Sequence, residues 1–375
     1  MHLLDDKIDQ VLSIPPYSQT PEEKRAALVE LLREELDCAV HRHAGYDNYL
    51  RGWPVDYRSA SQVSEFPYLP VGLLKANPPL SFIEPHEVKR TLTSSATTSQ
   101  SPSRVVLDSS TSRRMTKGVV SIVRDFIGTA RRPYLVIDTA DSLRGGNGAL
   151  GARTAAIQGL HPFASQSICV LEQNEQGDLV LNTSKLMEFA QAQQGAEVLV
   201  YGFTWILWNH LVKPLVEENI CLNLPNVRIL HSGGWKRLQD QAVAKSTFNE
   251  QLARVFGCTP DCVIDFYGMV ESVGVIFPDC PDGNKHAPAF GEVIVRDPLT
   301  LAPVAPGGHG IVQVCSILPT SFPGNLLLTE DMAQVLAYDG CSCGRRGISF
   351  RFAGRVPKAE LRGCGNLDVK RSAAH

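Results

Sequence analysis

The strongest constraint on the fold is an alternation, over residues 110–266, between short apolar runs and longer helical stretches. The apolar runs predict strands at 134–138, 179–181, 198–201, 227–231 and 263–266, and the stretches between them predict helices near 110–130, 150–160, 184–193, 203–218 and 238–256. Strands that alternate with helices of this length indicate right-handed crossover units and a mainly parallel sheet.

After about residue 285 the pattern changes to short strands that are interrupted by glycine and proline. This change predicts a smaller and more antiparallel β subdomain. We therefore expect residues 1–285 to form N-terminal helices and an α/β core, and residues 286–375 to form the β-rich subdomain.

The N-terminal region carries one clear helix signal. Thr20 is a suitable N-cap, Pro21 suits the first helical position, and Glu23 completes a capping box. These residues predict a helix over 20–44. The following residues 52–85 are rich in proline and aromatic side chains and predict mainly extended chain.

The composition excludes several classes of protein. Apolar residues make up 43% of the 375 residues and charged residues 20%, so a sizeable core can be buried. The net charge of −3 leaves no broad basic surface, which argues against nucleic acid as a partner.

The polar start of the chain lacks the pattern of a signal peptide. The apolar stretch 196–212 contains Glu197 and His210, so no membrane span is expected. In a cytoplasmic protein, as expected here, ten cysteines indicate reduced thiols, metal ligands or catalytic groups rather than disulfides.

Residues 93–102 form a run of hydroxyl-bearing side chains, Thr-Ser-Ser-Ala-Thr-Thr-Ser-Gln-Ser-Pro. Such hydroxyls, with the backbone N–H groups between them, can surround phosphate oxygens. The run is not the P-loop of the common NTPases, because the required glycines and lysine are absent. A polar surface loop is the alternative interpretation.

An aromatic residue, a glycine and a carboxylate come just after the predicted strand 263–266. In the sequence Asp-Phe-Tyr-Gly-Met-Val-Glu, Tyr267 can stack on a base and Glu271 can hold Mg²⁺. Open α/β sheets bind ligands at the carboxyl ends of their strands. A strand end followed by a simple turn is the alternative interpretation.

Two further elements, at 329–331 and 354–355, offer a carboxylate and a guanidinium that can hold a ribose and a phosphate. The complete order is hydroxyl loop, Tyr-Gly-x-x-Glu, Thr-x-Asp and Gly-Arg. This order resembles the adenylate-forming superfamily of acyl-CoA synthetases, peptide-synthetase adenylation domains and luciferases. Within it, the chain most resembles the acyl-protein synthetases of bacterial bioluminescence, which are Lux-type fatty-acid ligases. The features behind this narrower resemblance lie at 66–71, 153–157, 231–236, 267–269 and 360–364.

The resemblance implies an α/β adenylate-forming large domain, with mainly parallel sheets, helices and a smaller antiparallel β subdomain. It also implies that the usual mobile C-terminal domain is lacking, and that ATP and Mg²⁺ are the cofactors. The implied contacts are, for the phosphates, Thr93, Ser94, Ser95, Thr97 and Thr98; for the adenine, Gly233, Gly234, Tyr267 and Gly268; for Mg²⁺, Glu271; and for the ribose or α-phosphate, Asp331 and Arg355.

The chain departs from the family pattern in three respects. Ala96 and Ser99 stand where glycines are usual, which restricts the approach of the backbone to phosphate. Val270 replaces the usual threonine beside the carboxylate and removes one hydroxyl. Without the usual C-terminal domain, the lysine that assists adenylation is not assigned by position, and Lys236 and Lys358 are the candidates.

The cysteines and one histidine predict two more sites. Cys280 with His286, and Cys341 with Cys343, form two close pairs that suit tetrahedral Zn²⁺, and some adenylating relatives that they resemble bind a structural zinc there. Unliganded cysteines are the alternative. Cys364 lies between two glycines, and the family resemblance implies that it accepts the acyl group as a thioester; an incidental terminal thiol is the alternative.

The expected reaction activates a fatty or other hydrophobic carboxylic acid with ATP as acyl-AMP. The acyl group then passes to Cys364 and on to a partner protein, such as an acyl reductase or a carrier protein. One alternative is a stand-alone acyl or aryl ligase that delivers to CoA or a carrier protein without Cys364. Another is a catalytically impaired binding or scaffold protein, which the missing loop glycines suggest.

Overall fold

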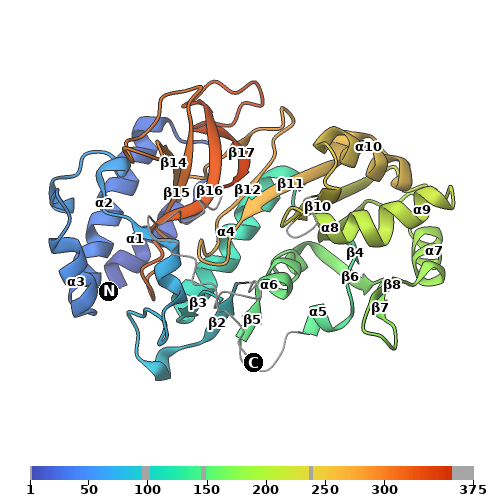
Figure 1. The fold of residues 1–375 in the computed structure, drawn as a ribbon, viewed down its shortest axis with the longest axis horizontal. Helices are drawn as coiled ribbons and strands as arrows, with labels where there is room; N and C mark the ends of the chain where they lie inside the picture. The colour runs from blue at the N-terminus through green and yellow to red at the C-terminus, as the bar shows by residue number, and fades with distance from the viewer. Residues whose placement is uncertain (1, 95–101, 145–148, 236–239, 357–375) are drawn as a thin grey trace, which may run out of the picture.

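The computed structural model describes residues 2–94, 102–144, 149–235 and 240–356 (Figure 1). One large sheet has the strand order β12-β11-β10-β9-β4-β6, and every strand except the edge strand β12 is parallel to its neighbours. These strands are β4 (Arg132–Val136), β6 (Ala164–Cys169), β9 (Val198–Phe203), β10 (Val227–Ser232), β11 (Val263–Gly268) and β12 (Ile276–Pro278). The predicted mainly parallel sheet is therefore confirmed.

Helices connect these strands, largely where the sequence predicts them. They are α4 (Ser109–Ile127), α5 (Asp141–Arg144), α6 (Ala152–Gly159), α7 (Thr183–Ala192), α8 (Thr204–Leu207), α9 (Lys213–Glu217) and α10 (Lys245–Phe256). Between α8 and α9 the chain passes through a π-helical turn, Trp208–Val212, so the helix predicted over 203–218 is continuous but contains one locally widened turn. The last helix begins at Lys245 rather than near 238.

A second large sheet, mainly antiparallel, has the order β13-β17-β16-β15-β14. Its strands are β13 (Lys285–His286), β14 (Gly291–Arg296), β15 (His309–Ser316), β16 (Leu326–Ala337) and β17 (Ser349–Arg355), and the two-residue β1 (Leu69–Pro70) joins β16 in parallel. The antiparallel character predicted after residue 285 is confirmed, although β16 is longer than the short strands expected.

The N-terminal helices are α1 (His2–Ser13), α2 (Pro21–Val40) and α3 (Ala44–Arg51). The predicted capping box is present, because Thr20 Oγ1 accepts from the Glu23 backbone N–H at 3.2 Å and the Glu23 carboxylate accepts from the Thr20 N–H at 2.9 Å. The helix ends at Val40 instead of residue 44. The expectation of extended chain over 52–85 is wrong: the segment contains a series of short 3₁₀ turns, at Tyr57–Ser59, Val63–Glu65, Val71–Lys75 and Pro85–Glu87, and only the two-residue strand β1.

These N-terminal helices share a hydrophobic core with the antiparallel sheet. Leu32 of α2 and Phe290 before β14 are almost completely buried in the same cluster, and Figure 1 shows α1 and α2 beside the orange strands. Segments far apart in the sequence therefore pack together, while the domain boundary near residue 285 stays a prediction. In the described part of the chain, no helix is long and apolar enough to cross a membrane.

Smaller elements complete the fold. β2 (Arg90–Thr93) pairs with β3 (Arg104–Leu107) and β5 (Ala149–Gly151), and β7 (Leu171–Gln173) forms a hairpin with β8 (Leu179–Leu181). Further 3₁₀ turns lie at His161–Phe163 and Pro260–Cys262. The β2–β3 pair holds the two ends of the hydroxyl-rich run side by side.

Candidate active site

A cavity of about 1580 Å³ is lined by the carboxyl ends of β10 and β11, by β16 and β17 of the second sheet, and by α4 and α6. This is the edge at which open α/β sheets bind ligands. The volume exceeds the roughly 300–1,000 Å³ of an ordinary small-molecule site. The cavity therefore has room for more than one small molecule.

The hydroxyl-rich run leaves β2 at one wall of this cavity. Ser94 lines the cavity, its Oγ accepts from the Ser103 backbone N–H at 2.8 Å, and its own N–H donates to the Ser103 carbonyl at 3.0 Å. Thr93 is not part of the wall, as the alternation of side chains along a strand requires. The rest of the run lies outside the described residues. It includes the predicted phosphate contacts Ser95, Thr97 and Thr98 and the positions Ala96 and Ser99, where glycines are usual.

The two glycines that follow β10 also line the cavity. Gly233 and Gly234 have positive φ angles of 83° and 57°. A Cβ atom on Gly233 would lie 2.4 Å from the ring of Phe203, so a larger residue would displace that ring. The glycines thus expose backbone without side chains at the wall, so a flat group such as the predicted adenine can approach it closely.

Tyr267, Asp331 and Arg355 meet at another wall of the cavity. The Tyr267 hydroxyl donates to Asp331 Oδ2 at 2.8 Å, and Arg355 Nε lies 3.4 Å from Asp331 Oδ1. The register of β16 and β17 places Asp331 opposite Arg355. Burial raises the pKa of Asp331 above its usual value, while Tyr267 and Arg355 favour its charged form. Residues predicted at the ribose and the base therefore lie together.

The ring of Tyr267 is already stacked within the protein. The centroids of Phe352 and Phe277 lie 5.0 Å and 5.8 Å from its own, with interplanar angles of 24° and 21°. Phe352 also lines the cavity and is 40% exposed. Tyr267 and Phe352 thus form an aromatic wall of the cavity, and Phe352 was missed because it belongs to none of the sequence motifs.

Glu271 reaches the same cavity from the turn after β11. Only 6% of its surface is exposed. Within the described part of the chain, its carboxylate has no hydrogen-bond or ion-pair partner. A largely buried carboxylate without a compensating charge is unfavourable, and carboxylate oxygens are ligands that Mg²⁺ prefers. This arrangement favours the magnesium role predicted for Glu271.

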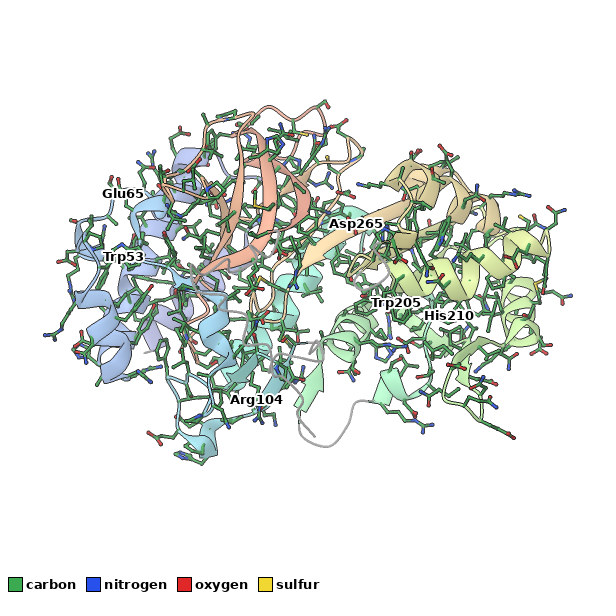
Figure 2. All side chains as sticks on the ribbon, viewed as in Figure 1. Trp53, Glu65, Arg104, Trp205, His210 and Asp265 are labelled. Carbon is green, nitrogen blue, oxygen red and sulfur yellow. The ribbon has the colours of Figure 1, made fainter. Side chains whose placement is uncertain are left out.

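Asp265 is a further cavity residue, to which the sequence motif assigned no role. It lies on β11 in the region between the antiparallel sheet and α10 (Figure 2). Lys285 Nζ lies 3.2 Å from Asp265 Oδ2, and His231 Nδ1 lies 3.6 Å from Asp265 Oδ1. Burial lowers the pKa of His231, so its ring is neutral and Lys285 supplies the countercharge.

A second cluster lies outside the cavity, where the β12–β13 turn meets the β16–β17 turn. The ligand atoms of Cys280, His286, Cys341 and Cys343 all lie within 4.8 Å of one another. The Cys280 and Cys341 sulfurs are 4.0 Å apart, and Cys343 Sγ is 3.4 Å from His286 Nε2. Four ligands at about 2.3 Å from a tetrahedral zinc would have sulfurs about 3.8 Å apart. The structure thus brings all four predicted ligands together.

The surroundings of this cluster also suit a cation. Burial lowers the pKa of His286 to about 4, so the imidazole is neutral and can act as a ligand at neutral pH. Burial raises the pKa of the Cys280 thiol to about 12, so a thiolate there requires a nearby positive charge. A zinc ion supplies such a charge, which supports the predicted site.

Three more predicted site residues, Lys236, Lys358 and Cys364, also lie outside the described residues. Their roles in adenylation and acyl transfer stay predictions.

The fold and the cavity define the class of protein first. The structure is similar to 2-hydroxyisobutyryl-CoA ligase in an open conformation with 2-HIB-AMP and CoA, with a TM-score of 0.68 and 15% identity, covering 92% of this chain and 78% of that one. It is equally similar to the same ligase in its thioesterification state, with a TM-score of 0.68 and 16% identity over 91% of this chain and 70% of that one. The chain therefore has the adenylate-forming fold, as the resemblance in its sequence predicted.

The family model described as "Acyl-protein synthetase, LuxE" matches residues 3–371, so the chain belongs to this family. It is 29% identical to the long-chain-fatty-acid–luciferin-component ligase of Vibrio harveyi over 138 residues. The matched segment covers 36% of this chain and 35% of that protein. It is 30% identical over 110 residues to the ligase of the same name from Aliivibrio fischeri, 29% of each chain. The matches span about a third of the length of these relatives.

Proposed function

We propose that this protein activates a carboxylic acid with ATP as acyl-AMP and transfers the acyl group to a protein thiol. The observation that carries the proposal is the convergence of Glu271, Asp331 and Arg355 on one cavity with Ser94 at its edge, in a chain that belongs to the acyl-protein synthetase family. No protein nucleophile is needed for the first step, because the acid itself attacks the nucleotide.

The polar walls of the cavity suit a nucleotide. The Gly233–Gly234 backbone and the aromatic wall would contact the adenine, and Asp331 would accept hydrogen bonds from the ribose hydroxyls. Arg355 would bind the ribose or the α-phosphate as a fixed cation. The hydroxyl-rich run beyond Ser94 would surround the β- and γ-phosphates.

The apolar walls suit a hydrophobic acid. α4 contributes Met115 and Val119, and α6 contributes Ala155, Ala156 and Gly159. Small side chains on α6 leave space that an acyl chain can fill, with the burial of apolar surface as the driving force. A fatty acid, as in the names of the two ligases above, is the substrate class that we propose.

In the first step an acid oxygen attacks the α-phosphorus of ATP, and the bond to pyrophosphate breaks. Arg355 and the hydroxyl donors stabilise the charge that develops on the phosphate oxygens. Glu271 would hold Mg²⁺, which when bound neutralises the departing pyrophosphate. Bringing both substrates into one enclosed space lowers the entropic cost of the reaction.

In the second step a thiol loses its proton and attacks the acyl carbonyl, and AMP leaves. We propose Cys364 as this thiol, because thiolates are far better nucleophiles than hydroxyls at neutral pH. The thioester would then pass its acyl group to a partner protein, such as an acyl reductase or a carrier protein. The cytoplasm is the proposed location.

ATP–pyrophosphate exchange with a panel of acids tests the proposed function. We expect exchange that depends on the acid and that is fastest with hydrophobic, straight-chain acids. Short polar acids serve as controls for the apolar wall. Absence of exchange with every acid, in protein that still folds, would support a binding or scaffold role instead.

We also propose that the Cys280–His286–Cys341–Cys343 cluster binds one structural zinc ion. Four protein ligands fill a tetrahedral shell and leave no open position for chemistry. Hydrogen bonds around the cluster support this role. The Asn284 side chain donates to Cys341 Sγ at 3.6 Å, and Asp282 Oδ2, which lies 3.3 Å from Cys341 Sγ, accepts from Ser342 at 2.6 Å.

Untagged protein is expected to contain one zinc per chain by elemental analysis. Removal of the metal should lower Tm by at least about 5 °C, since a tightly bound ion stabilises only the folded state. Cys341→Ser should lose the metal, whereas Cys221→Ser, which alters an exposed thiol away from the cluster, should retain it. Protein without zinc whose Tm does not respond to chelator would contradict the site.

A further inference from the structure

A chain of alternating charges connects α10 to the wall of the cavity. Lys245 on α10 pairs with Asp279 at 2.5 Å, and Lys285 Nζ lies 3.1 Å from Asp279 and 3.2 Å from Asp265. Lys285 is 3% exposed and Asp279 is 6% exposed, whereas Asp265 lines the cavity. Lys285 is thus the direct countercharge of a carboxylate that faces the substrates.

The strand that carries Lys285 also carries a ligand of the metal cluster. β13 contains only Lys285 and His286, and successive side chains of a strand point to opposite faces. Lys285 contacts Asp265, and His286 contacts Cys343. One two-residue strand therefore joins the metal cluster to the cavity wall.

The backbone pairing of this strand is short, although both of its side chains are buried. β13 pairs with β17 through two residues, Lys285 opposite Phe350 and His286 opposite Ser349, and a single bridge joins Lys285 to Asp279. Cys341 and Cys343 lie in the turn just before β17. A metal bound to both turns would therefore hold β13 against β17 and fix the position from which Lys285 reaches Asp265.

We infer that the metal centre and the nucleotide site are energetically coupled through β13, with Lys285 as the positioning residue that holds Asp265 in the cavity wall. This inference rests on the proposed function, because it takes the bound molecule to be ATP. Metal binding orders β13, the ion pair then fixes the Asp265 carboxylate, and a fixed carboxylate can accept hydrogen bonds from the nucleotide without first reorganising.

The groups around the Lys285–Asp265 ion pair determine how the loss of Lys285 would affect Asp265. The neutral His231 ring also lies near Asp265, and the Thr204 hydroxyl lies 3.0 Å from its Nδ1. Lys245, which pairs with Asp279, acts on Asp265 only from beyond ion-pair distance. Without Lys285, no full positive charge contacts Asp265 among the described residues. Its carboxylate would then turn toward solvent in the cavity or take up a proton, and either change weakens ATP binding.

The test is the Kd for ATP, measured by calorimetry in the absence of acid. Lys285→Met in zinc-loaded protein is expected to raise this Kd about 10-fold, within the 5–150-fold range of typical couplings between sites. Lys285→Arg should restore most of the affinity because it keeps the charge. Lys245→Met removes the outer lysine of the same charge chain, which acts on Asp265 only from beyond ion-pair distance. It is the matched control and should raise the Kd much less than Lys285→Met.

Zinc removal from the wild type should raise the ATP Kd by a similar factor, and zinc reloading should reverse it. The effects of zinc removal and Lys285→Met should not add, because both act through the same ion pair. By linkage, saturating ATP should tighten zinc binding by the same factor. Equal ATP affinity with and without zinc, or fully additive effects, would overturn the inference. If the wild type itself fails to bind ATP, the proposed function fails instead, so the two failures can be told apart.

Discussion

Glu271→Gln is expected to lower acid-dependent ATP–pyrophosphate exchange by about 100-fold or more, which is typical when one electrostatic contact to a transition state is lost. The substitution keeps the size of the side chain and removes the charge. Since Glu271 is 6% exposed and has no partner among the described residues, its loss should leave the fold intact. The far-ultraviolet circular dichroism spectrum and Tm should therefore match those of the wild type.

The dependence on magnesium distinguishes a role in metal binding from a general effect of charge. If Glu271 holds Mg²⁺, the variant should require a much higher magnesium concentration for half-maximal exchange. Glu250→Gln, on the exposed face of α10, is the control and should behave as the wild type. Wild-type exchange by Glu271→Gln, with a suitable acid, would remove this residue from the proposed mechanism.

Cys364→Ser is expected to abolish stable acylation of the chain while ATP–pyrophosphate exchange continues. A serine hydroxyl at neutral pH is too poor a nucleophile to replace the thiolate. The measurement is the amount of hydroxylamine-sensitive label on the protein after incubation with ATP and labelled acid. Cys221→Ser, which changes an exposed thiol of the same chain, is the control and should remain labelled.

Two outcomes would change the acyl acceptor that we propose for the second step. Label that persists on Cys364→Ser would identify another cysteine as the acceptor. Absence of label on the wild type, together with accumulation of acyl-AMP, would favour a ligase that delivers directly to CoA or a carrier protein. In either case the proposed activation of the acid would stand, because exchange reports only the first step.

The sequence predicted the fold class because the relevant signals are local. Apolar runs such as Tyr134 to Ile137 are too short for helices and lie between helical stretches, which favours buried strands. The capping box of Thr20 and Glu23 fixes a helix start through contacts within one turn. The segment 52–85 was mispredicted for the same reason. Its prolines exclude regular helix, but they do not distinguish extended chain from successive 3₁₀ turns.

The sequence also marked much of the candidate site, since its motifs keep their spacing at strand ends. Tyr267 and Glu271 follow one strand, and Asp331 and Arg355 lie opposite each other on a strand pair. Phe352 carried no such signal, because only the close approach of the two sheets stacks it on Tyr267.

Local patterns in the sequence thus predict which side chains stand at strand ends and turns, because hydrophobic periodicity and capping depend on neighbours within a few residues. Which of these side chains meet depends on how the elements pack. The Lys285–Asp265 pair and the Cys280–Cys341 contact join residues 20 and 61 positions apart. Their distances follow from how β13 and the β16–β17 turn pack beside β11, which no local pattern encodes. Electrostatic and metal-ligand contacts act over only a few ångströms, so packing alone brings these groups within range of one another.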